Sequence, residues 1–178
     1  AFARYKLNVA QLLLTHSDLD SRTRRINAKN TLERLLAAGN IVPIINENDS
    51  VAVEELRFGD NDRLSAEVAM LAGATLLLIL TQVDGLMDSG GRVIARVRDV
   101  GRVRNLATET KGKFSQGGMI SKLQAVEMAV DAGITTIIIN GRRPHLISEV
   151  VAGKQAGTHF VARRRNGARA ASLTEPRS

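Results

Sequence analysis

Cysteine is absent from the 178-residue sequence, and aromatic side chains are scarce, with four Phe, one Tyr and no Trp. Without cysteine the chain has no disulfide and no thiolate metal site, which is compatible with the reducing cytoplasm, where we expect the protein to act. Long apolar runs are missing as well. The run Leu76 to Leu80 is far shorter than the roughly 20 residues of a membrane-spanning helix, so we expect no contact with a membrane.

Two kinds of catalytic site lack their usual sequence patterns. His16, His145 and His159 are scattered and show no ligand spacing such as H-E-x-x-H, so we predict no metal site built from protein side chains. There is neither a G-x-S-x-G motif nor a cysteine nucleophile, which disfavours acyl-enzyme chemistry.

Positive charge is concentrated at the C-terminal end. The formal net charge is +7, and residues 163 to 178 hold five Arg against one Glu, which is +4 and leaves +3 for residues 1 to 162. We interpret residues 163 to 178 as a disordered, solvated tail, with nucleic-acid contact as the alternative. The alternative is disfavoured because the tail has no aromatic residue on which a base could stack.

Strand and helix patterns alternate along residues 1 to 162, which form one domain in this interpretation. This alternation predicts an α/β fold with a mainly parallel open sheet sandwiched by helices. We predict a hairpin at 51–58 and a short strand within 92–104. The other predicted strands are 7–14, 41–45, 75–80, 135–139 and 158–162, and the predicted helices are 20–38, 64–71, 119–132 and 144–151.

Two polar clusters interrupt the middle of the chain. Asn46 to Asp49 follows the strand predicted at 41–45, and Gly59 to Asp62 precedes a helical pattern. Ligands of open α/β sheets bind beyond the carboxyl ends of the strands, so these clusters predict a site. The alternative is that they form turns and caps, and Asn61 or Asp62 is well placed to cap the helix over Leu64 to Leu71.

A glycine-containing segment, Lys111 to Lys122, has the features of a phosphate-binding loop. Adjacent glycines let backbone N–H groups approach a phosphate, and a lysine one turn into the following helix can reach it. The segment is not a Walker A sequence, and a structural glycine turn is the alternative. Thr81 and Asp84, after the most apolar strand, either line a nucleotide pocket or close a turn.

Three motifs together resemble the glutamate 5-kinases of the amino acid kinase superfamily. They are IINENDSV at 44–51, FGDNDRLSA at 58–66 and GGMISKLQA at 117–125. The supporting similarity extends from about Val9 to about Phe160, so the resemblance covers nearly all of residues 1–162. The first two motifs are specific to glutamate 5-kinases, whereas the third is shared more widely.

The resemblance implies ATP-dependent phosphorylation of the γ-carboxylate of L-glutamate to L-glutamyl 5-phosphate, the first step of proline synthesis, with Mg²⁺. It also implies a homo-oligomer. Carried over by motif, Asp49 and Asn61 correspond to glutamate-binding residues. Lys122 corresponds to a catalytic lysine that stabilises the transferring phosphoryl group, and Asp62 to the organiser of the catalytic lysines. The implied ATP-binding positions are Thr81, Gln82, Gln116, Gly117, Gly118, Met119, Ile120, Ser121 and Lys122.

The chain also departs from this family's pattern. Relatives have an opening strand with a Gly-rich loop and a first catalytic lysine, then a segment with a substrate-binding serine, and both are expected before Ala1. Gln82 stands where the family usually has Asp, and Ser115-Gln116 replaces a usual Gly-Thr. We therefore expect residues 1–162 to be a partial, N-terminally truncated kinase domain with little or no activity alone.

Two alternatives stay open. The chain could be another member of the superfamily, such as a carbamate or uridylate kinase, since these share the glycine pair and the lysine. It could also be a non-catalytic nucleotide-binding or nucleic-acid-binding module, because the first lysine loop is missing and arginines are frequent at 92–104 and 163–169.

Overall fold

A computed structural model describes residues 2–51, 60–109 and 116–163. The hairpin predicted at 51–58 lies outside the described residues except for Val51. The loop residues 111–115 and the tail residues 164–178 also lie outside them. Among the described helices, none is long and apolar enough to cross a membrane.

The first layer is a two-stranded parallel sheet. Strand β1 (Asn8–Leu14) pairs with β2 (Ile41–Glu47) in a register that joins Asn8 to Ile41 and Leu14 to Glu47. β2 therefore continues two residues beyond its predicted end, because Asn46 and Glu47 still pair with the last residues of β1. A single turn of 3-10 helix, η1 (Phe2–Tyr5), precedes β1.

The helix predicted at 20–38 is two helices, α1 (His16–Asp20) and α2 (Arg22–Ala37). α1 begins early because Thr15 and Asp18 form a capping box, in which each side chain bonds the other residue's backbone N–H. Ser21 separates the helices because it has an extended conformation, with φ −71° and ψ 121°.

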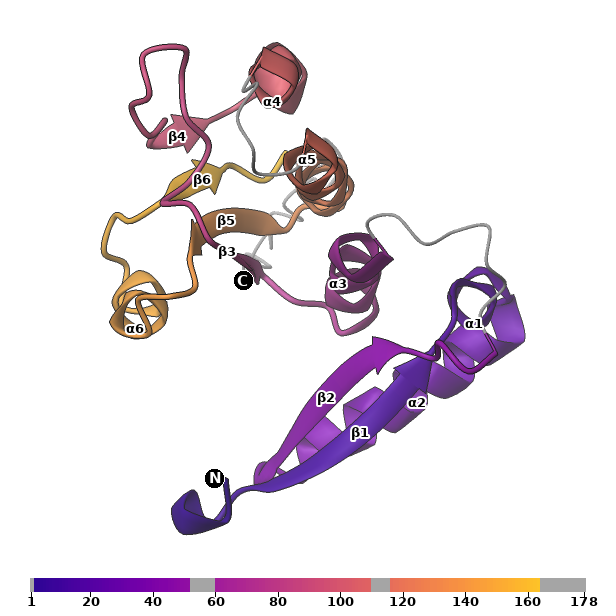
Figure 1. Cartoon of the computed structure of the whole chain (residues 1–178). Coiled ribbons are helices and arrows are strands. Elements are labelled where there is room, and N and C mark those ends of the chain that lie inside the picture. Colours follow the sequence, from indigo (N-terminus) through magenta and orange to yellow (C-terminus); the bar gives the residue numbers. More distant parts are fainter. Residues whose placement is uncertain (1, 52–59, 110–115, 164–178) are drawn as a thin grey trace, which may run out of the picture.

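The second sheet has four strands in the order β3-β5-β6-β4. β3 (Leu76–Thr81) is parallel to β5 (Thr135–Asn140), and β4 (Arg96–Val97) is parallel to β6 (Thr158–Phe160). β5 and β6 are antiparallel. The prediction of a mainly parallel α/β fold is confirmed, but the described strands form two sheets instead of one (Figure 1).

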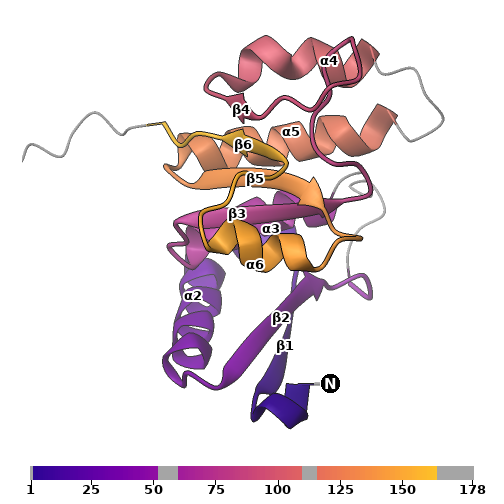
Figure 2. The same ribbon diagram turned by 90° about the vertical axis from the view of Figure 1, so that its left-hand side faces the viewer.

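Helices cover both faces of the second sheet (Figure 2). α5 (Gln116–Asp131) packs on one face and α6 (His145–Val151) on the other. Successive residues of β5 point to opposite faces, so Ile138 packs in the cluster under α5, whereas Ile137 and Ile139 pack with Val150 of α6. The remaining short elements are η3 (Val100–Val103) and α4 (Arg104–Glu109).

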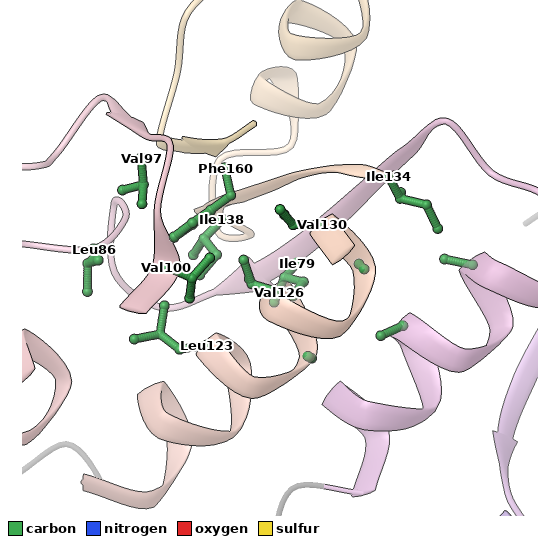
Figure 3. Close-up of a cluster of buried hydrophobic side chains, with 14 residues drawn as sticks. Ile79, Leu86, Val97, Val100, Leu123, Val126, Val130, Ile134, Ile138 and Phe160 are labelled. Atoms are coloured by element: carbon green, nitrogen blue, oxygen red, sulfur yellow. The ribbon is translucent and has the colours of Figure 1, made fainter. Parts of the chain in front are cut away.

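The main core lies between α5 and the second sheet. Phe160 and Ile138 are fully buried there and pack with Val126 and Val130 of α5 (Figure 3). Because β5 and α5 are held on this core, the ends of both elements have fixed positions.

α3 (Asp60–Leu71) joins the two sheets, because it contacts both β2 and β3. Leu64 and Leu71, one heptad apart, pack with Leu19 of α1 and Leu32 of α2, beside the first sheet. Ala66 and Ala69, on a different face of α3, belong to the main core. α3 begins at Asp60, so the prediction that Asn61 or Asp62 caps it is wrong: both residues lie inside its first turn.

Candidate functional site

The first turn of α3 and the second turn of α5 meet at an ion pair. Lys122 Nζ lies 3.0 Å from Asp62 Oδ2, and each side chain is 18% exposed. The hydroxyl of Ser121 donates a hydrogen bond of 2.7 Å to the same carboxylate oxygen. α3 and α5 are in contact along the core, so their packing brings together two residues that are 60 positions apart.

A cavity of about 560 Å³ opens beside this ion pair. We call it the Lys122 cavity. Its described lining comes from the end of β3 and the turn after it, from the first two turns of α5, and from the turn after β5. The residues are Leu80, Thr81, Gln82, Val83, Gly118, Met119, Lys122 and Arg142.

Five of the predicted ATP-binding residues line this cavity, namely Thr81, Gln82, Gly118, Met119 and Lys122. Ser121 turns to Asp62 instead, and Ile120 is 37% exposed and lies outside the described lining. Gln116 and Gly117 open α5.

The helix predicted from Met119 begins three residues earlier, so Gly117 and Gly118 belong to its first turn and not to a loop. The first four N–H groups of an α-helix have no partner within the helix, and the helix dipole places partial positive charge there. The start of α5 therefore offers N–H donors and positive charge beside Lys122.

A second cavity, of about 480 Å³, lies along α3 between β2 and β3. We call it the α3 groove. Its described polar lining is Asn46, Asn61 and Ser65. The rest of the lining is apolar and consists of Ile45, Leu64, Val68, Ala69, Ala72, Ala74 and Leu77.

The structure does not bring the predicted glutamate-binding residues into one cavity. Asn61 lines the α3 groove, whereas Asp49 is exposed in the turn after β2 and lies outside the described lining of both cavities. Asp62, the neighbour of Asn61, contacts Lys122. Neighbouring residues of α3 thus face the α3 groove and the Lys122 ion pair.

Asp84, predicted either to line a nucleotide pocket or to close a turn, links the turn after β3 to the turn after β5. Its carboxylate accepts a hydrogen bond of 2.9 Å from Asn140 Nδ2 and lies 3.5 Å from Arg143. It is outside the described lining of the Lys122 cavity.

Sequence reasoning missed two features near the site. Glu67 of α3 is only 6% exposed, and its two oxygens lie 2.8 Å from Arg63 and 3.4 Å from His16. His16, at the start of α1, therefore lies beside the helix that holds Asp62. Arg142 was also missed. The sequence did hold a signal for it, because the strand predicted at 135–139 ends at the same sheet edge as the site, and a cation follows that strand closely.

A profile of the Amino acid kinase family matches residues 1–140. The chain belongs to the amino acid kinase family. Among curated relatives, a glutamate 5-kinase of Thermus thermophilus is 48% identical over 171 residues, which is 93% of this chain and 46% of that protein. The glutamate 5-kinase of Shewanella oneidensis is 45% identical over 168 residues, covering 90% of this chain and 45% of that protein. This family member therefore spans less than half the length of these relatives.

Solved structures show the same amino acid kinase fold. N-acetylglutamate synthase from Neisseria gonorrhoeae superposes with a TM-score of 0.60 at 21% identity, over 77% of this chain and 31% of that one. UMP kinase from Bacillus anthracis superposes with a TM-score of 0.55 at 14% identity, over 88% of this chain and 59% of that one. At these identities the likeness concerns the fold alone.

Proposed function

We propose that the Lys122 cavity binds the phosphates of ATP and that the chain is part of a glutamate 5-kinase. The observation that supports this most is the Asp62–Lys122 ion pair beside the first turn of α5. Phosphoryl transfer requires positioning and positive charge at the transferring group more than it requires a covalent nucleophile. Lys122 supplies the charge, and Asp62 holds its ammonium group in place.

The proposed acceptor is the γ-carboxylate of L-glutamate. One of its oxygens attacks the γ-phosphorus of ATP, the bond from that phosphorus to the β,γ-bridging oxygen breaks, and the products are L-glutamyl 5-phosphate and ADP. This would be the first step of proline synthesis, and we expect it in the cytoplasm. Two glutamate 5-kinases at 45% and 48% identity support the choice of substrate. Asp49 and Asn61 remain our candidates for binding glutamate.

Mg²⁺ fits this scheme as a companion of the nucleotide. The described residues contain no group of three or more His, Cys, Asp or Glu side chains that could hold a metal ion. Mg²⁺ commonly binds through substrate phosphates and waters plus one or two carboxylates, so it needs no cage of protein ligands. When bound, the ion would neutralise charge on the phosphates.

We propose that this chain alone has little activity, since the first lysine and the Gly-rich loop of the glutamate 5-kinases are not among its residues. Those groups would supply the donors on the other side of the γ-phosphate.

The test is an activity assay on a completed protein. Joined to the N-terminal segment of the Thermus thermophilus relative, the chain should consume ATP in the presence of glutamate and not in the presence of UMP. Lys122→Ala should lower kcat about a hundredfold or more, the usual cost of removing a group that stabilises transition-state charge. Lys154→Ala is the matched control, because Lys154 is 67% exposed and pairs with Glu149.

Activity with UMP in place of glutamate would favour the uridylate kinase alternative and contradict the proposed substrate. Full activity in Lys122→Ala would contradict the role of the Lys122 cavity.

A further inference from the structure

Two consecutive arginines follow β5, and the turn that presents them is bound to the end of β3. The backbone N–H of Gly141 donates a hydrogen bond of 2.8 Å to the carbonyl oxygen of Thr81. Asn140 Oδ1 accepts the backbone N–H of Arg142 at 2.9 Å, and its Nδ2 donates to Asp84 at 2.9 Å. The backbone of Arg142 therefore has a defined place at the rim of the Lys122 cavity.

The two side chains have different surroundings. Arg143 lies 3.5 Å from the carboxylate of Asp84 and outside the described lining of the cavity. Arg142 lines the cavity together with Lys122, and no carboxylate of the described residues pairs with it. Because Asp84 is occupied by Asn140 and Arg143, it leaves the guanidinium of Arg142 available to a ligand.

The charge of the cavity depends on Arg142. Its described lining contains Lys122 and Arg142 and no acidic residue, and the charge of Lys122 is offset by its contact with Asp62. A guanidinium group can bind a phosphate through two parallel hydrogen bonds, and it stays protonated under all physiological conditions. Arg142 is thus suited to attract an anion into this cavity alongside Lys122.

We propose that Arg142 binds a phosphate oxygen of the nucleotide in the Lys122 cavity, as a second cation beside Lys122. This inference rests on the proposed function, because it takes a nucleotide to be the ligand. Arg142 acts here on binding and not on the chemical step.

The test compares ligands that differ in phosphate number. The affinities of ATP, ADP and adenosine are measured by titration calorimetry for the chain and for Arg142→Gln, Arg142→Lys and Arg143→Gln. Arg142→Gln should weaken the binding of ATP and of ADP about ten- to a hundredfold, the range expected for losing a hydrogen bond to a charged group. The affinity for adenosine should change less than about twofold. The affinity of Arg142→Lys for ATP should be intermediate, because lysine keeps the positive charge but cannot form the two parallel hydrogen bonds of a guanidinium group.

Arg143→Gln is the matched control, since it removes the same charge one residue away and should leave the affinity for ATP within about twofold at moderate salt. Equal affinities of Arg142→Gln and Arg143→Gln for ATP would overturn the inference. An equal loss for adenosine and ATP would also overturn it, because the contact would then be to the nucleoside.

The outcomes separate this inference from the proposed function. If Lys122→Ala weakens ATP binding and Arg142→Gln does not, the assignment of Arg142 fails and the nucleotide site stands. If the unmodified chain shows no saturable binding of ATP, both fail.

Discussion

The Asp62 carboxylate accepts contacts from two side chains of α5, and the one from Lys122 is an ion pair with both partners 18% exposed. A double-mutant cycle with Asp62→Asn and Lys122→Met should give a coupling of about 1 kcal/mol in the free energy of unfolding. Asparagine can still accept the hydrogen bond from Ser121, so the cycle isolates the charge interaction.

A surface pair on α2 provides the comparison for this cycle. Lys29 and Glu33 lie 3.6 Å apart with exposures of 52% and 56%, and such i,i+4 pairs contribute about 0.2–0.5 kcal/mol. Denaturant titrations of both sets of variants would measure the two couplings. A coupling for Asp62 and Lys122 no larger than that for Lys29 and Glu33 would contradict their role as a fixed pair.

His159 of β6 should make stability depend on pH. Burial lowers the pKa of its imidazole below the ordinary 6.5, and nearby Arg96 lowers it further, against a hydrogen bond with the carbonyl oxygen of Ala156. The unfolded state therefore takes up a proton first as the pH falls. The stabilising contribution of neutral His159 is complete above pH 6.5 and is lost as the pH falls through the lower folded-state pKa.

Unfolding free energies measured from pH 8 to pH 5 would check this prediction. His159→Gln should lose less stability on acidification than the unmodified chain. If the unfolding free energies of His159→Gln and the unmodified chain fell in parallel with pH, His159 would not contribute to the pH dependence of stability.

Some residues of the site could be predicted from sequence, and others could not. Asp62 and Lys122 stand in motifs whose residue types already suggest phosphate chemistry, and the structure places them in contact. Arg142 and Glu67 stand in no such motif. Their positions depend on how β5 meets β3 and how α1 meets α3, and these are tertiary contacts that no local pattern shows.

Among the elements, α1 shows how strongly one cap can determine local structure. The Thr15 side chain accepts the backbone N–H of Asp18 at 3.3 Å, and Asp18 accepts the backbone N–H of Thr15 at 2.9 Å. Thr15→Ala should lower the free energy of unfolding by about 1 kcal/mol, the usual cost of losing an N-cap. The control is Thr31→Ala within α2, where alanine is the better helix former and should be neutral or slightly stabilising.

The same cap adds a signature at low pH. Hydrogen bonds from the Thr15 side chain and backbone hold the pKa of Asp18 below its ordinary 3.8. The contribution of ionised Asp18 to the free energy of unfolding is complete above pH 3.8 and is lost as the pH falls through the lower folded-state pKa. A destabilisation by Thr15→Ala that stayed unchanged at pH values below the pKa of Asp18 would contradict the capping box.

Element types were easier to predict than element ends. Each strand of the second sheet overlaps its prediction, because runs such as Leu76 to Leu80 have the apolar character of strands buried on both faces. Helix starts were harder. α5 begins at Gln116 and includes Gly117 and Gly118. Adjacent glycines usually favour a loop over a helix, so the sequence placed this start too late.

At the scale of the whole molecule, the α/β class follows from the alternation of elements, but the division into two sheets does not. Alternation predicts parallel strands and crossover helices without saying which strands are neighbours. Here α3 leads from β2 to β3, and these strands remain in separate sheets with the α3 groove between them. The division into two sheets does not divide the Lys122 cavity. Its described lining comes from the second sheet, the turns after β3 and β5, and α5, and the sheet and α5 share the main core.

The central claim is that this core positions a nucleotide site at Lys122, and a titration of ATP with Mg²⁺ into the chain tests it most directly. We expect saturable binding with a dissociation constant at or below about 1 mM, within the usual range for enzyme substrates. Lys122→Ala should bind at least about tenfold more weakly, as for the loss of a hydrogen bond to a charged group, and the exposed Lys154→Ala should bind like the unmodified chain. Equal affinities of Lys122→Ala and Lys154→Ala, or no saturable binding by the unmodified chain, would contradict it.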